Sequence, residues 1–227
     1  MIISHKHRFI FIKSKKTAGT SIEMALCAIC GDEDVITAMN PEDESLRFEK
    51  TGRNAQNTRI PLAKYSLKDW GRFLLKGKRA HFYNHMTARE VKRYIGSAVW
   101  NNYYTFCFDR DPVTKAISHF KWRGKKVHFE SFEAYLSSVD INMIKGDVYY
   151  ADAAGNSLVD EVFKMEDIPG AFAKIKAEIG SDELRAPDFK TKQSTGSDEL
   201  SPEYVREHFG DTLKTIFKTE YNTLYKE

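Results

Sequence analysis

The residues best suited to chemistry stand in a cationic loop close to the N-terminus. A short apolar strand, Arg8 to Lys13, leads into Lys15-Lys16-Thr17-Ala18-Gly19-Thr20-Ser21, and Ile22 to Ile29 has the pattern of a helix. The N-terminus of a helix offers unpaired N–H groups and partial positive charge, and a glycine lets the backbone approach an anion closely. Strand, loop and helix in this order predict a binding site for a nucleotide phosphate.

A second strand–loop–helix unit presents an arginine. Tyr103 to Phe108 has the composition of a buried strand, and Asp109-Arg110-Asp111-Pro112 follows it. The second aspartate suits an N-cap and the proline suits the first helical position, so a helix is expected to run to about Trp122. Ligands of open α/β sheets bind beyond the carboxyl ends of the strands, which is where Arg110 is expected to lie.

Neither unit matches the phosphate loop of ATP- and GTP-hydrolysing enzymes. That motif, G-x-x-x-x-G-K-[ST], has a glycine at its front and a lysine after its second glycine, whereas here the lysines precede Gly19. No predicted strand ends in a clear aspartate for magnesium. Hydrolysis of ATP through a loop-bound magnesium is therefore not expected.

The two units together resemble the motifs of the sulfotransferase family. The stretch Lys15 to Ser21 is similar to the phosphosulfate loop Pro-Lys-Thr-Ala-Gly-Thr-Ser, with Lys15 in place of the proline. The family's second motif is Arg-Asp/Asn-Pro with a serine eight residues after the arginine, and Arg110 and Ser118 have that spacing. The motifs follow one another in the family's order, so the pair is more specific than either alone.

Weaker similarity extends over most of the remaining chain. Tyr83 to Glu90 resembles a histidine-then-helix segment of the carbohydrate-type sulfotransferases, and Tyr149 to Asp167 resembles their hairpin. Met165 stands where the family often has an aromatic residue near adenine. The similarity is thinnest at residues 40–77 and 186–200.

The resemblance implies a fold, a donor and a set of roles. The implied fold is α/β, a central parallel sheet flanked by helices in the P-loop-like sulfotransferase arrangement. The implied donor is 3′-phosphoadenosine 5′-phosphosulfate (PAPS), with 3′,5′-bisphosphoadenosine (PAP) as product and no metal. Lys16 aligns with the catalytic lysine that neutralises the leaving oxygen, and Arg110 and Ser118 with the residues that hold the 3′-phosphate. The expected donor-binding residues are Lys15, Lys16, Thr17, Ala18, Gly19, Thr20, Ser21, Arg110, Ser118, Lys190 and Lys192.

Sulfuryl transfer to a hydroxyl also needs a group that removes the proton of the acceptor. His85 is the candidate, because the pKa of histidine lies near neutral pH and the residue directly follows a predicted strand, Arg79 to Tyr83. His81 is the first alternative, and Asp109 and Glu23 are more distant ones. Trp122 and Arg123 are candidates for the acceptor cleft, although core packing is an equal alternative for Trp122.

Length and composition suit one globular domain spanning residues 1–227. The net charge is +3, and 41% of the residues are hydrophobic, which does not favour a nucleic-acid partner. No apolar run approaches the roughly 20 residues of a membrane span, and no secretory segment precedes the first strand, so a cytoplasmic protein is expected. Cys27, Cys30 and Cys107 lie in apolar segments and are expected in the core.

The remaining segments are predicted as follows. Asp32 to Met39 holds a short strand, and residues 40–77 form an irregular insertion with one helix near Leu67 to Leu75. Val148 to Tyr150 and Leu158 to Met165 are extended, Ile168 to Ile179 is a helix, residues 186–200 form a loop that covers the donor, and one helix runs from Ser201 to about Tyr225.

These predictions favour a PAPS-dependent sulfotransferase acting on a hydroxyl of a carbohydrate or glycolipid. One alternative is a non-catalytic relative that binds nucleotides or sulfated glycans, and a less favoured one is a P-loop-type kinase. The identity of the acceptor and the oligomeric state are not predicted.

Overall fold

A five-stranded sheet forms the centre of the computed structural model, which describes residues 1–187 and 200–226. Its strands have the order β3-β1-β2-β4-β5. They are β1 (Ile2–Ser4), β2 (Phe9–Ile12), β3 (Val35–Ile36), β4 (Tyr104–Asp109) and β5 (Glu161–Lys164). Strands β2, β4 and β5 are parallel, whereas β1 is antiparallel to both β2 and β3. The α/β class is confirmed, and the prediction of a parallel sheet holds only for the half that carries the site.

The antiparallel half exists because β1, a strand that the sequence pattern did not indicate, pairs with β2 through a four-residue turn. Such a short connection permits only antiparallel pairing. The carboxylate of Asp34 holds the turn by accepting hydrogen bonds from Ser4 Oγ (2.7 Å) and from the backbone N–H groups of His5 (2.6 Å) and Lys6 (3.0 Å). A three-residue strand is too short to show a periodic pattern, which is why it was missed.

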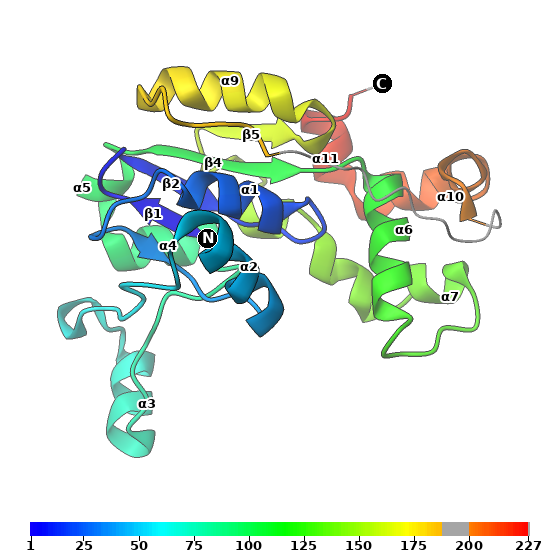
Figure 1. Cartoon of the computed structure of the whole chain (residues 1–227). Coiled ribbons are helices and arrows are strands. Elements are labelled where there is room, and N and C mark those ends of the chain that lie inside the picture. The colour runs from blue at the N-terminus through cyan, green and yellow to red at the C-terminus, as the bar shows by residue number, and fades with distance from the viewer. Residues whose placement is uncertain (188–199, 227) are drawn as a thin grey trace.

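Helices cover both faces of the sheet and its carboxyl end (Figure 1). The α-helices are α1 (Gly19–Cys27), α2 (Pro41–Thr51), α3 (Leu67–Lys76), α4 (Ala88–Ile95), α5 (Ser97–Trp100), α6 (Pro112–Arg123), α7 (Phe132–Leu136), α8 (Asp147–Tyr150), α9 (Ile168–Ile179), α10 (Pro202–Ile216) and α11 (Lys218–Thr223). Three 3₁₀ segments complete the structure, η1 (Leu62–Lys64), η2 (Val139–Ile144) and η3 (Met165–Asp167).

The strand side chains alternate between two cores, as the period of a strand requires. Phe9 and Phe11 lie on the face covered by α1 and α9, whereas Ile10 and Ile12 lie on the face covered by α4 and α8. A third core forms among α6, α7, α10 and η2. Cys27, Cys30 and Cys107 are free and buried, so the prediction that they pack in the core is confirmed.

Residues 40–77 are more regular than predicted. Helix α2 was missed because it has few apolar side chains, but its ends carry clear signals. Asn40 accepts from the N–H of Asp43 (2.9 Å), Pro41 occupies the first turn, and Gly52 ends the helix at φ 67°. The predicted helix near Leu67 to Leu75 is present as α3.

Three further predictions of secondary structure were wrong. Val148 to Tyr150 lies in the helical turn α8 rather than in a strand, because burial of the Tyr149 and Tyr150 rings outweighs their strand propensity. Arg79 to Tyr83 forms only an isolated bridge, between His81 and Arg59, outside the sheet. The final helix is interrupted at Phe217 (φ −104°, ψ 37°), which separates α10 from α11.

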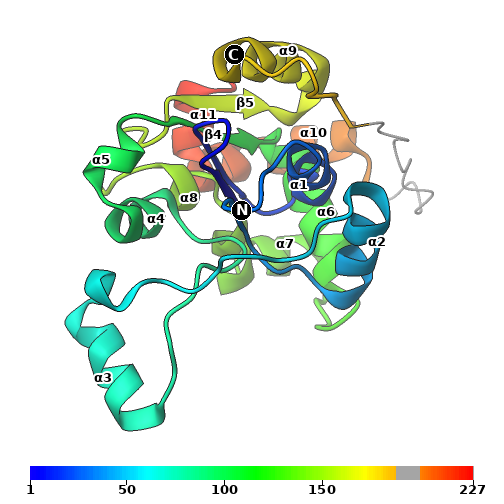
Figure 2. The same cartoon turned by 60° about the vertical axis from the view of Figure 1, so that its left-hand side comes forward.

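One segment projects from the remaining structure. Figures 1 and 2 show α3 projecting away from the sheet in both views, with a contact to α4 at its first turn, where the Tyr94 hydroxyl donates to Asp69. Within residues 1–187 and 200–226, no helix combines the length and the apolar character needed to cross a bilayer.

Candidate functional site

The loop between β2 and α1 has an unusual backbone. Lys16 and Ala18 both have positive φ, at 63° and 53°. Such angles are uncommon for residues other than glycine, and successive residues of alternating handedness turn backbone N–H groups toward a common point, an arrangement that binds anions. Ala18 is the N-cap of α1, and no side chain caps this helix end. The first N–H groups of α1 are therefore available to a ligand.

Lys13, at the start of the loop, belongs to the interior. Its ammonium group lies 2.7 Å from Glu23, and Glu23 also pairs with the amino group of Met1 (3.1 Å) and with Arg47 (3.7 Å). A Cβ atom at Gly19 would lie 2.9 Å from Lys13 Cγ, so a glycine is needed where the loop crosses this side chain. The positive charge of Lys13 is therefore offset by Glu23 and adds little to the field of the loop.

Unlike Lys13, Arg110 has no ion-pair partner among the described residues. Its Nε donates to Thr114 Oγ1 (3.0 Å), and no carboxylate of the described residues lies within ion-pairing distance of its guanidinium group. Burial is the main cause that lowers the pKa of Arg110, and the charges of Glu166 and Asp111 oppose this shift. Arg110 thus combines partial burial with unused hydrogen-bond donors.

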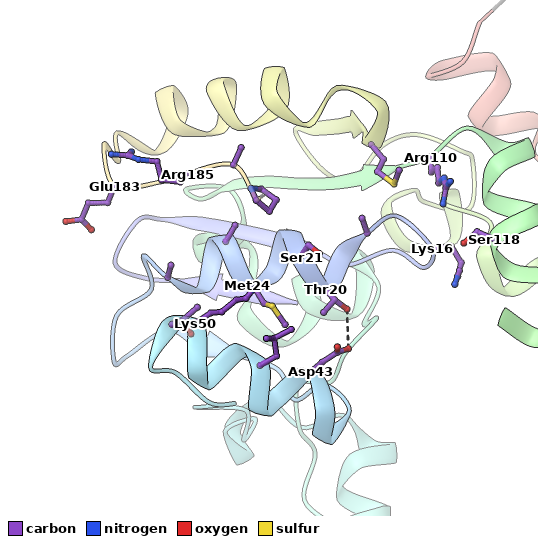
Figure 3. Close-up of a pocket in the computed structure, with 18 residues that line it drawn as sticks. Lys16, Thr20, Ser21, Met24, Asp43, Lys50, Arg110, Ser118, Glu183 and Arg185 are labelled. Atoms are coloured by element: carbon purple, nitrogen blue, oxygen red, sulfur yellow. Dashed lines mark hydrogen bonds between the residues drawn. The ribbon is translucent and has the colours of Figure 1, made fainter. Parts of the chain in front are cut away.

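A cavity of about 870 Å³ brings the two units together (Figure 3). Lys16, Arg110 and Ser118 lie at one end, and Lys50, Glu183 and Arg185 lie at the other. The lining residues are Lys16, Ala18, Thr20, Ser21, Met24, Ala25, Ala28, Asp43, Leu46, Lys50, Thr51, Arg110, Ser118, Met165, Glu183, Arg185, Ala186 and Pro187. Side chains almost a hundred residues apart in sequence therefore share one site.

Lys16 is one of the cations that line this cavity. Its ammonium group lies 5.4 Å from the centroid of the Trp122 ring. Burial lowers the pKa of Lys16, and the charges of Arg110 and Lys125 lower it further. Repulsion between neighbouring cations favours an anion between them. Trp122 is 44% exposed, so it does not belong to the buried core, and it is not among the residues that line the cavity.

Some of the other loop residues line the cavity, and the rest do not. Ala18, Thr20 and Ser21 line the cavity, and Thr20 Oγ1 lies 3.5 Å from Asp43. Thr17 is buried, and its hydroxyl contacts Ser14 Oγ (3.1 Å). Lys15 and Gly19 are not among the lining residues.

His85 lies beside the loop and outside the lining of the cavity. Its Nδ1 is 3.0 Å from the carbonyl oxygen of Lys13. Because a carbonyl only accepts, Nδ1 carries the proton in the neutral ring and Nε2 is left with a free lone pair. Burial lowers the pKa of His85 to about 4, with the nearby charge of Lys13 adding to the effect. The ring is therefore neutral at pH 7 and able to accept a proton.

The alternative bases lie in unsuitable surroundings. Glu23 and Asp109 are fully buried in ion pairs, with Lys13 and Lys115 respectively. His81 lies at the root of the projecting segment, where its Nδ1 is 3.3 Å from Thr58 Oγ1. Arg123, a candidate for the acceptor cleft, is paired with Asp140 (2.9 Å).

Several residues of the site were not foreseen. Asp43 and Lys50 line the cavity from α2, and Arg185 and Pro187 line it from the segment that follows α9. No motif marks these positions, because they reach the cavity only through the packing of α2 and α9 against α1 and β5. Met165 also lines the cavity. The predicted contacts of Lys190 and Lys192, and most of the covering loop at 186–200, lie outside the described residues.

No cluster of three or more His, Cys, Asp or Glu side chains suitable for a metal occurs in the part of the chain that the structure describes. Comparison of the chain with protein-family models, with curated proteins and with solved structures finds no match.

Proposed function

We propose that the protein is a sulfotransferase that moves a sulfuryl group from PAPS to a hydroxyl of a carbohydrate or glycolipid, and that its fold is the P-loop-like sulfotransferase fold. The observation that carries this proposal is the shared cavity. The loop with Lys16 and the pair Arg110 and Ser118, identified separately as two motifs of that family, line one space. Residues that merely matched a pattern by chance would not be expected to converge in this way.

The residues of the cavity fit a donor with two anionic groups. The N-terminus of α1, with Thr20 and Ser21, would hold the 5′-phosphosulfate, and Arg110 with Ser118 would hold the 3′-phosphate. The donor would supply the activated sulfuryl group. The fit is supported by the positive φ angles of Lys16 and Ala18, since strained backbone persists where the surroundings or a ligand require it.

Two side chains would carry the chemistry. In the reaction, the acceptor oxygen forms a bond to sulfur while the bond between sulfur and the bridging phosphate oxygen breaks. Lys16 would stabilise the negative charge that the departing phosphate oxygen gains. His85 Nε2 would take the proton of the acceptor hydroxyl. In-line displacement requires the attacking and leaving oxygens on opposite sides of sulfur, which suits a base outside the donor cavity.

The lowered pKa of His85 is the specific observation in favour of a second candidate function. Burial lowers this pKa to about 4, so the ring is a weaker base than an ordinary histidine, and it does not line the cavity. A relative that binds the nucleotide without catalysis would retain the cavity and would not need a stronger base beside it. Binding of PAP without sulfuryl transfer to any member of a panel of glycans and glycolipids would favour this alternative.

The decisive experiment compares PAP with ATP by calorimetry, on the native chain and on Arg110→Ala. We expect PAP to bind more tightly than ATP, and Arg110→Ala to weaken PAP binding by about tenfold to a hundredfold, as is usual for a lost hydrogen bond to a charged group. Arg72→Ala, which removes an exposed arginine from α3, is the matched control and should leave the affinity unchanged. Equal affinity for ATP and PAP, or binding of neither, would overturn the proposal.

A further inference from the structure

Residues 61–79, called the arm below, project from the structure on two antiparallel segments. The N–H of Ile60 donates to the carbonyl of Ala80 (3.1 Å), and the N–H of Phe82 donates to that of Thr58 (2.8 Å). Beyond this pair of segments the chain continues into η1 and α3. Figures 1 and 2 show α3 projecting away from the sheet, and its first turn contacts α4 through Asp69 and Tyr94.

The outward face of α3 is apolar. Leu67, Leu74 and Leu75 are 92%, 75% and 85% exposed. Their spacing of i, i+7 and i+8 places them on one face of the helix, with Gly71 between them. Three leucines so strongly exposed on one face are unusual, because a helix normally turns its apolar stripe toward the core.

The inward face of α3 is already occupied, so the leucines are not required for folding. Asp69 accepts from the backbone N–H of Ser66 (2.9 Å) and from the Tyr94 hydroxyl (3.1 Å) on α4. Trp70 and Phe73 pack with Tyr65 at ring-centroid distances of 5.5 and 6.2 Å. These contacts fix the orientation of α3 and leave its leucine face in solvent.

The arm also concentrates positive charge. It contains six exposed cations, Lys64, Lys68, Arg72, Lys76, Lys78 and Arg79. Its one acidic residue, Asp69, is buried. The net charge of these nineteen residues is therefore +5, whereas the entire chain carries +3 and the remainder of the chain carries −2.

We propose that the arm docks the protein onto an anionic membrane surface, independently of the function proposed above. An interfacial helix combines exposed leucines, which enter the boundary of the acyl chains, with flanking lysines and arginines that bind anionic headgroups. A bilayer needs no shape complementarity and so accepts a convex projecting helix. A second copy of the chain is disfavoured as the occupant, because it would bring two segments of charge +5 together.

The test is co-sedimentation of the full chain with phosphatidylcholine vesicles that contain or lack phosphatidylserine. We expect binding to the anionic vesicles to be at least about tenfold stronger and to weaken as salt is added. Leu74→Ser with Leu75→Ser, and separately Lys76→Glu with Lys78→Glu, should each reduce binding by about tenfold or more. Because all four side chains are exposed, the unfolding midpoints of both variants should equal that of the native chain.

Two matched controls carry the same kinds of change elsewhere. Val139→Ser alters an apolar side chain that is 82% exposed on η2. Lys218→Glu with Lys226→Glu changes the net charge by the same amount at the other end of the chain. Both controls should bind like the native chain.

Three outcomes would overturn the proposal. The first is equal binding to neutral and anionic vesicles, or binding to neither. The second is a loss of binding that is the same in the arm variants and the controls. The third is native-chain dimerisation without vesicles that the leucine variant abolishes, which would make the arm a contact between copies.

Discussion

Lys13 and Lys16 lie three residues apart but differ in charge pairing: Lys13 pairs with a buried carboxylate, and Lys16 lines the cavity without one. Lys13 is buried, and its ammonium group pairs with the carboxylate of Glu23, which also pairs with the amino group of Met1 and with Arg47. Lys16 opens onto the cavity together with Arg110, and neither forms an ion pair with a described carboxylate. The lower region (Met1, Lys13, Glu23 and Arg47) therefore contains its own carboxylate partner, whereas the cations of the upper region (Lys16 and Arg110) have none among the described residues.

The difference separates charge that supports the fold from charge that is available to a ligand. A buried ion pair contributes little net stability, but the removal of one partner leaves an uncompensated charge in the interior. A cluster of cations without internal partners gains from an external anion instead. Mutations in the lower region should therefore lower the free energy of unfolding, and mutations in the upper region should lower the affinity for the ligand.

The largest effect is expected for Glu23→Gln. This change leaves the amino group of Met1, Lys13 and Arg47 without their shared counter-charge, so the free energy of unfolding should fall by about 3–5 kcal/mol. Glu183→Gln, at the exposed end of the cavity, is the control and should change it by less than about 0.5 kcal/mol. Urea unfolding measures both. Equal stability of the two variants would contradict the view that the lower cluster supports the fold.

Gly19→Ala changes a residue of the loop but should act on the ion pair of Lys13 in the lower region. The added Cβ would lie 2.9 Å from Lys13 Cγ, which forces the lysine away from Glu23 and should cost about 1–3 kcal/mol of unfolding free energy. Gly210→Ala is the matched control, because nothing lies within 4 Å of a Cβ there and alanine favours the helix by about 0.5–1 kcal/mol. A neutral Gly19→Ala variant would show that the loop can move away from Lys13.

Lys16→Met tests the upper region alone. The affinity for PAP should fall by about tenfold, with an unfolding midpoint like that of the native chain. Lys13→Met is the counterpart, since it should lower stability by leaving Glu23 short of one partner. Calorimetry and urea unfolding on both variants distinguish the roles. An unfolding midpoint lowered by Lys16→Met would remove the contrast between the two lysines.

The effect expected to be smallest near pH 7 concerns the pH dependence of stability. Burial lowers the pKa of His85, and of His119, from the ordinary 6.5 to about 4. Between these values the unfolded chain binds protons that the folded chain does not, so stability falls as the pH falls. The loss is at most about 1.4 kcal/mol per pH unit for each histidine.

His85→Gln should remove its share of this slope between pH 6.5 and 4 and leave stability near pH 7.5 less affected. Below pH 4.5, Glu23 adds a further loss, because ion pairing lowers the pKa of its carboxyl group in the folded state. Urea unfolding at several pH values measures both ranges. An unchanged slope in His85→Gln would show that the ring is not held neutral by burial.

The candidate anion-binding loop could be located from the sequence because its signals are local. A strand, a turn with glycine and a helix start, and likewise Arg110 followed by a proline at a helix start, are encoded within a few residues. Strand β1 and helix α2 were not predicted because neither segment has a repeating pattern of apolar residues. Tyr149 was predicted to lie in a strand because its intrinsic propensity favours strands. The burial that favours the helical turn α8 depends on tertiary packing, which propensity does not include.

Residue types and spacing alone predicted the α/β class and the phosphate-type loop, and the resemblance of the two motifs to one family added Lys16 and Arg110 as candidates for one anionic ligand. Only the tertiary structure decided that Lys13 is paired with a carboxylate while Lys16 is not. It also decided that Asp43 and Arg185 join the cavity, and that Leu74 and Leu75 face outward. The reason is that the exposure and the ion pairing of a side chain depend on which distant segments pack against it. A local sequence pattern does not specify those segments.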